Sequence, residues 1–168
     1  GRAGGSLIRA DYSSAIGLHT FSAEYNMNST DLFCHTDFNQ DDVNPSLSRN
    51  TSTHEEFWIG RTKSFGSSNY FIDGQIGELF VFTTTLNTAQ ENILQNYLSA
   101  KFGMTATNDM YTYEANHGLG LVGIGQEDVS NLHTNSIGNG YVRISSPTSL
   151  NSGDYLFVGH NDVNISAL

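Results

Sequence analysis

Apolar and polar residues alternate along much of the chain, in short runs that turn-forming residues separate. A period of two is typical of β-strands, because successive side chains point to opposite faces of a sheet. In the first third of the chain the pattern predicts a polar loop over residues 39–54. It predicts strands in SLIRA (6–10), LHTFSAEY (18–25), DLFCHTDF (31–38) and EEFWIGR (55–61).

The run YFIDGQIGELFVF at 70–82 has apolar residues on both faces, as expected of a strand that is covered on both sides. Beyond residue 110 the pattern predicts strands in LGLVGIG (119–125), YVRISS (141–146) and DYLFVGH (154–160). Stretches rich in Gly, Asn and Ser, such as NSIGNG (135–140) and LNSGD (150–154), are typical of turns.

One segment has helical periodicity instead. Asn87 is the expected N-cap, and Gln90 lies three residues later, where a capping box needs it. Gly103 stands where a left-handed C-cap is expected. The sequence therefore predicts a helix over 88–102. Its apolar positions are Ile93, Leu94, Tyr97 and Leu98, and Lys101 falls in its last turn.

Charge and composition narrow the function classes. The 168 residues carry a formal net charge of −10, with 17 acidic and 7 basic residues. Phosphate-backbone binding needs the opposite sign, so we expect neither a nucleic-acid partner nor attraction to anionic lipid. No apolar run is long enough to span a bilayer, so no membrane insertion is expected. Cys34 is the single cysteine, which excludes an intrachain disulfide.

A glycine pattern at Gly118, Gly120 and Gly123 has the spacing of a dinucleotide-binding fingerprint. A true fingerprint follows a strand and opens a helix, whereas acidic and turn-forming residues follow here. Glu127 and Asp128 would also repel a pyrophosphate. We therefore interpret the glycines as part of a strand whose backbone is closely approached.

Oxygen-bearing side chains at Asp37, Asn39 and Asp41 resemble the start of a calcium-binding loop. Asp42 replaces the glycine of an EF-hand at the sixth position, and Ser48 replaces the glutamate at the twelfth. The stretch is therefore not an EF-hand. It is either a lectin-like loop that holds one calcium ion or an exposed acidic loop.

Catalytic patterns are weak. Glu55 and Glu56 are adjacent, so in a strand they point to opposite faces and do not flank one glycosidic bond. The six histidines form no HxH or HxxxH pair, and no serine nucleophile elbow is present.

Two stretches resemble known families. The run from Phe71 to Glu78, followed by Leu86 and then by YLSAKFG at 97–103, is similar to the end of laminin-G-like, concanavalin-A-like jelly rolls in large bacterial surface proteins. GLVGIGQEDVSNLHTNSIGNG (120–140) and DYLFVGHND (154–162) resemble a small β domain that often follows that jelly roll.

The resemblance implies an all-β fold. We expect an antiparallel jelly-roll sandwich with one C-terminal α-helix over residues 1–105, and a small β domain over 106–168. A complete jelly roll needs more strands than the first domain holds, so we expect it to be incomplete at the N-terminus. The second domain is small enough that we expect it to continue past residue 168.

The resemblance also implies an extracellular or cell-surface location and a non-catalytic role in adhesion or structural spacing, alongside other modules of a longer chain. The first alternative is carbohydrate binding, with calcium as a candidate cofactor and an extracellular glycan or surface protein as partner. Candidate ligand residues for it are Phe65, Tyr70 and the 37–44 loop. The second alternative is a glycoside hydrolase or lyase on the same fold.

Overall fold

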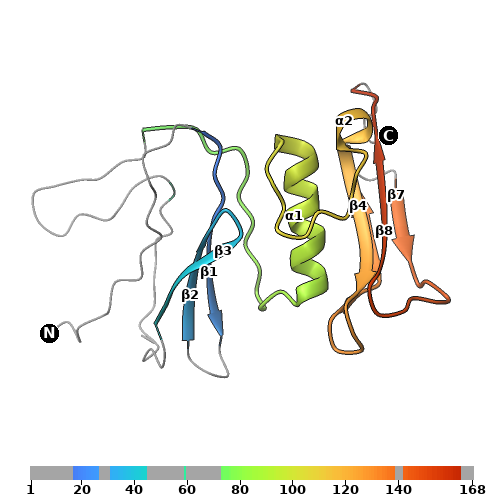
Figure 1. The fold of residues 1–168 in the computed structure, drawn as a ribbon, viewed down its shortest axis with the longest axis horizontal. Coiled ribbons are helices and arrows are strands. Elements are labelled where there is room, and N and C mark those ends of the chain that lie inside the picture. Colours follow the sequence, from blue (N-terminus) through green and yellow to red (C-terminus); the bar gives the residue numbers. More distant parts are fainter. Residues whose placement is uncertain (1–16, 27–30, 45–58, 60–72, 139–141, 164–168) are drawn as a thin grey trace, which may run out of the picture. The chain divides into compact units, whose positions relative to one another are not determined.

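A computed structural model describes residues 17–26, 31–44, 59, 73–138 and 142–163. Apart from two helices, its regular structure consists of strands in antiparallel sheets, which agrees with the expected all-β class. No helix in these ranges is long and apolar enough to cross a membrane. In chain order the elements are β1 (Phe21–Asn26), β2 (Asp31–Thr36), β3 (Asn39–Asn44), α1 (Thr88–Phe102), α2 (Glu114–His117), β4 (Leu119–Gln126), β5 (Leu132–His133), β6 (Asn135–Gly138), β7 (Val142–Ser145) and β8 (Asp154–His160) (Figure 1).

The chain divides into two compact units. Residues 48–83 form one unit, and residues 1–47 together with 84–168 form the other. In the larger unit, β1, β2 and β3 pair in sequence order as an antiparallel meander. A second sheet has the order β5–β4–β8, and β6 pairs with β7.

The predicted polar loop over 39–54 is wrong in its first part, because residues 39–44 form β3. Their polar side chains concealed the strand, since a ladder to β2 depends on backbone groups and not on apolar side chains. A polar border strand is also common, because it discourages further pairing. Residues 45–54 lie outside the described part of the chain.

The predicted strand over 70–82 is wrong over 73–82, where the chain has no strand pairing. Ile76, Leu79 and Val81 are 50%, 52% and 73% exposed, so this run is not covered on both faces. The rings of Phe80 and Phe82 instead stack on each other, with centroids 6.3 Å apart. The strand predicted over 55–61 falls almost wholly outside the described residues.

The helix prediction is confirmed, residue for residue, by α1. Asn87 Oδ1 accepts a hydrogen bond from the Gln90 backbone N–H, and Gln90 Oε1 accepts one from the Asn87 N–H, both at 3.0 Å. This is a complete capping box. At the other end, Gly103 has a φ of 68° and donates its N–H to the Ser99 carbonyl, as a left-handed cap should.

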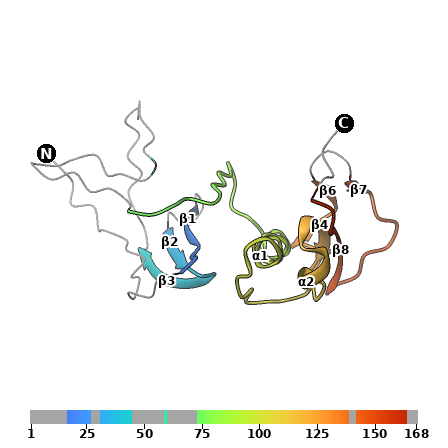
Figure 2. The ribbon, with the colours of Figure 1, turned by 90° about the horizontal axis from the view of Figure 1, so that it is seen from above.

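One face of the β5–β4–β8 sheet packs against α1, as both ribbon views show (Figures 1 and 2). On this face Gly123 lies opposite Phe157, and Gly125 lies opposite Tyr155. A Cβ atom on Gly123 would stand 2.7 Å from the Phe157 ring, and one on Gly125 would overlap the Tyr155 ring. The glycines therefore make room for two aromatic rings, which confirms that the glycine pattern belongs to a strand.

The opposite face of β4 is also buried. Val122 and Ile124 are only 4% and 2% exposed. The β6–β7 hairpin packs against β4 here, and a Cβ atom on Gly138 would stand only 3.1 Å from the Val122 Cβ. The predicted turn over 135–140 is thus wrong at 135–138, which form β6. By contrast, residues 150–154 do turn, and the Asp154 N–H bonds the Asn151 carbonyl at 3.0 Å.

Asn96 ties α1 to the segment that leads into α2. It is completely buried, and all its bonding groups are used. Its Nδ2 donates to the carbonyls of Asn92 and Asn108, both at 2.8 Å. Its Oδ1 accepts the N–H groups of Met110 and Tyr111, at 2.8 and 2.9 Å. Because the buried Asn96 amide has all its hydrogen-bond partners, it holds the backbone of residues 108–111 in one conformation after the helix.

We expect Gly123→Ala to lower the free energy of unfolding by about 1–3 kcal/mol, because the new methyl group overpacks the Phe157 ring. In a Phe157→Ala background the same change should cost much less, so the two substitutions should be strongly non-additive. Urea unfolding of the four proteins measures this coupling. Gly17→Ala is the control, since its Cβ would meet only ordinary contact. Simple additivity of the two changes would contradict the glycine–aromatic packing.

Candidate functional site

The predicted calcium-binding residues fall at the tight turn between β2 and β3. Thr36 pairs with Asn39, so Asp37 and Phe38 form a two-residue hairpin loop. Both have positive φ angles, 49° and 67°. Two positive φ angles are the signature of a type I′ turn, which matches the twist of the flanking strands. Aspartate tolerates this conformation better than most residues, whereas phenylalanine does not.

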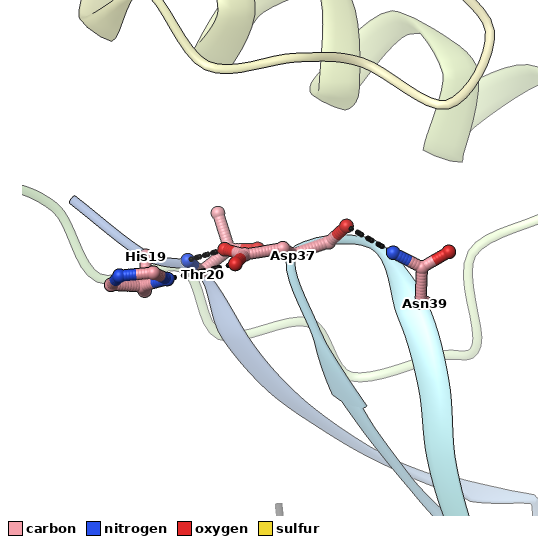
Figure 3. Close-up of polar contacts among 4 residues, drawn as sticks. All are labelled: His19, Thr20, Asp37 and Asn39. Atoms are coloured by element: carbon pink, nitrogen blue, oxygen red, sulfur yellow. Dashed lines mark hydrogen bonds and ion pairs between the residues drawn. The ribbon is translucent and has the colours of Figure 1, made fainter. Parts of the chain in front are cut away.

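Asp37 anchors this turn to the chain that leads into β1, as Figure 3 shows. Its Oδ2 lies 2.7 Å from His19 Nδ1, and its Oδ1 accepts the Thr20 N–H at 3.0 Å. The Asp37 N–H in turn donates to the Thr20 carbonyl at 3.1 Å. Both carboxylate oxygens therefore already have protein partners.

Asn39 lies beside Asp37 but turns its amide nitrogen toward it. Asn39 Nδ2 donates to the Asp37 backbone carbonyl at 3.0 Å (Figure 3). The register between β2 and β3 shifts at this point and leaves Asp41 without a partner residue in β2.

The structure therefore brings Asp37 and Asn39 together, but the bonds between them stabilise the turn. In the described ranges no group of three or more His, Cys, Asp or Glu residues is arranged to hold a metal ion. Each carboxylate oxygen has two lone pairs and uses one of them here, so Asp37 retains the capacity to bind a further group at either oxygen. Calcium at Asp37, Asn39 and Asp41 stays a prediction. The alternative ligand candidates Phe65 and Tyr70 lie outside the described residues.

Chemically, the His19–Asp37 pair is an imidazole oriented by a carboxylate. The His19 side chain is 19% exposed and that of Asp37 is 41% exposed. A carboxylate on Nδ1 fixes the ring and favours the tautomer that has its proton on that nitrogen. In this structure the pair has a structural role, because its bonds hold the β2–β3 turn against the residues that precede β1.

A second polar cluster, which the sequence analysis missed, joins α1 to the sheet. Tyr155 OH donates to Glu127 Oε1 at 2.7 Å. Asn92 Nδ2 approaches the same Glu127 oxygen at 2.8 Å and the phenol oxygen at 3.1 Å. No spacing rule links residues 92, 127 and 155, because only the tertiary fold brings them together.

The cluster changes the acidity of its phenol. Burial raises the pKa of Tyr155 to about 12; the bond from Asn92 acts in the opposite sense, and the bond to Glu127 and its charge add to the rise. A phenol with so high a pKa stays protonated at neutral pH, so it serves as a hydrogen-bond donor there and not as a base.

A neighbouring group of residues, in the turn after β4, supports the start of α1. Asp128 Oδ1 accepts the N–H groups of Ser130 and Asn131, and Oδ2 accepts Asn131 Nδ2. These bonds lower the pKa of the Asp128 carboxyl. Asn131 Oδ1 then faces the Thr88 N–H at 3.4 Å, and Asn87 Nδ2 donates to the Leu132 carbonyl at 3.1 Å. The acidic residues that follow the glycine-rich strand thus position a helix N-terminus.

A shallow hollow lies between the end of α1, α2 and β8. Its volume is about 240 Å³, and its polar lining residues are Glu114, Asn116, His160 and Asn161. Small-molecule sites usually enclose about 300–1,000 Å³ and are mostly apolar. The hollow is therefore smaller and more polar than a typical ligand pocket.

Comparison of the chain with known proteins finds no matching family model, no matching curated protein and no matching solved structure. The resemblance to laminin-G-like jelly rolls and to the small β domain stays a prediction.

We expect Asp37→Ala to expose the Thr20 N–H to hydrogen exchange, because the substitution removes its acceptor. A bond worth about 1 kcal/mol corresponds to exchange that is roughly fivefold faster. Asp37→Asn is the matched control, since it keeps an acceptor oxygen and tolerates the positive φ. Amide exchange followed by NMR measures both. Equal exchange in the wild type and Asp37→Ala would show that the carboxylate does not anchor the turn.

The raised pKa of Tyr155 predicts that the folded chain loses stability at alkaline pH. Its pKa is raised in the folded chain from 10.0 to about 12, so the unfolded chain releases the proton first as pH rises. The stabilising contribution is complete below pH 10 and is lost as pH rises toward 12. The free energy of unfolding should therefore fall more steeply in that interval for the wild type than for Tyr155→Phe. Urea unfolding at several pH values tests this, and parallel curves would contradict it.

Proposed function

We propose that this chain is a non-catalytic module of a secreted or cell-surface bacterial protein, and that it serves adhesion or structural spacing between other modules. The jelly-roll assignment of residues 1–105, with the small β domain after it, belongs to the same proposal. It is supported by the β1–β3 meander and by α1, which ends in the lysine–phenylalanine–glycine step on which the resemblance depends.

The observation that carries the proposal is how the polar side chains around α1 are used. Asn96 makes four internal bonds, and Asn92, Glu127 and Tyr155 bond to one another between the helix and the sheet. Asn87 and Asn131 hold the helix N-terminus. Bonds within the fold stiffen it, and stiffness is what a spacer needs.

The location of these bonds also matters. They join segments that are distant in sequence, such as residue 92 with residues 127 and 155. A module that transmits force between neighbouring domains benefits from such cross-links, whereas a ligand site needs a few polar groups that remain free to bind the ligand.

Mechanical unfolding of single molecules tests the spacing role. The whole chain, placed between two marker domains, should resist force and unfold in a distinct event. Asn96→Ala should lower the unfolding force, because it leaves two buried N–H groups and two carbonyls without their partner. Asn116→Ala, at an exposed position in α2, is the matched control and should leave the force unchanged.

Three outcomes would contradict the proposal. Extension without a resisted event would remove the spacing role. Calcium-dependent glycan binding that Asp37→Asn abolishes would favour the lectin-like alternative instead. Substrate turnover that survives purification and depends on a described carboxylate would favour the hydrolase or lyase alternative.

A further inference from the structure

His133 lies on the face of the sheet that packs against α1. It pairs with Gly125 across β5 and β4, and paired residues of an antiparallel ladder carry their side chains on the same face. That face is directed at the helix, since the Tyr155 ring that covers Gly125 bonds to Asn92 of α1. The His133 side chain is accordingly half-buried, whereas its neighbour Leu132 is 39% exposed. The imidazole therefore belongs to the contact between the sheet and the helix.

β5 and the turn before it are bonded to the start of α1. Asn87, the N-cap, donates from Nδ2 to the Leu132 carbonyl at 3.1 Å, and the Thr88 N–H faces Asn131 Oδ1 at 3.4 Å. The N-terminal end of a helix carries a partial positive charge, because its first N–H groups have no partner within the helix. A neutral imidazole is compatible with that end, whereas an imidazolium is repelled by it.

The acidic side chains around this contact do not compensate a charge on the imidazole. They are Glu91 in the first turn of α1 and Glu127 and Asp128 after β4, and β4 itself has no titratable side chain. Glu127 bonds to the Tyr155 phenol, which stays protonated at neutral and acid pH, and Asp128 bonds within its own turn. Burial lowers the pKa of the His133 imidazole from its ordinary value of 6.5, and no charge among the described residues offsets this effect.

We propose that protonation of His133 in mild acid separates β5 and the turn before it from the first turn of α1, while the rest of the sheet stays folded. The chain would then carry a contact that is closed at neutral pH and opens locally in acid. This acid response does not depend on the proposed spacing role, because it concerns one contact within the chain.

The direction of the pH dependence follows from where the proton binds first. Because the pKa of His133 is lowered in the folded contact, the opened or unfolded chain takes up the proton first as pH falls through 6.5. Above that pH the imidazole is neutral in both states and costs the folded contact nothing. Below it the contact loses stability until both states are protonated. Burial raises the pKa of Glu91, which acts in the opposite direction, and it does so with or without His133.

Amide hydrogen exchange of the full chain, followed by NMR from about pH 7.5 to about pH 5, tests the proposal. Exchange rates are compared with those of an unstructured peptide at the same pH. In the wild type, protection of the Thr88 and Gln90 N–H groups should fall severalfold toward acid pH, because their acceptors on Asn131 and Asn87 belong to this contact. Protection of the Tyr111 N–H, which is bonded away from β5, should stay constant.

Two histidine variants isolate the group. His133→Gln cannot be charged and keeps a polar side chain, so protection of the Thr88 N–H should no longer depend on pH. His117→Gln is the matched control, since it makes the same change at an exposed histidine of α2. It should respond to acid like the wild type.

NMR titration of the carbon-bound ring protons of His133 in the wild type needs no variant. The midpoint should lie below that of a histidine in an unstructured peptide, and a midpoint at or above that value would overturn the proposal. An acid response of the Thr88 N–H that His133→Gln retains would also overturn it. So would an equal loss of protection at Tyr111, because the whole chain would then unfold and not one contact.

Discussion

The packing of two aromatic rings over two glycines holds the C-terminal part of the structure together. Phe157 and Tyr155 occupy the space that a Cβ atom would take on Gly123 and Gly125. Their rings stack with centroids 6.0 Å apart and lie nearly parallel. With larger residues on β4 the rings would be displaced, and Tyr155 would lose its position beside Asn92 and Glu127. The close approach of α1 to the sheet depends on this arrangement.

The polar bonds around α1 are organised by that apolar contact. Once the helix lies on β4, Asn96 reaches the backbone of residues 108–111, and Asn87 reaches the turn after β4. Asp128, which would be unfavourable beside a phosphate, orders that turn instead. A glycine-rich strand followed by acidic residues therefore has a structural explanation that involves no nucleotide.

Local signals in the sequence predicted some elements accurately and missed others. The capping box at Asn87 and Gln90 and the left-handed Gly103 define α1 through contacts within a few residues, so they can be read directly. The strand β3 was missed because its residues are polar and its pairing is made by the backbone. Residues 73–82 show the opposite case. Their apolar pattern predicts a strand, but a strand forms only where a partner strand is present, and these residues have no strand pairing.

The candidate site was predictable to a similar degree. Asp37 and Asn39 are close together, as their spacing suggested, but the pairing of β2 with β3 shifts register and leaves Asp41 without a partner residue in β2. A register shift depends on the partner strand, so the residues themselves do not reveal it. The cluster of Asn92, Glu127 and Tyr155 depends in the same way on contacts between segments that are far apart in sequence.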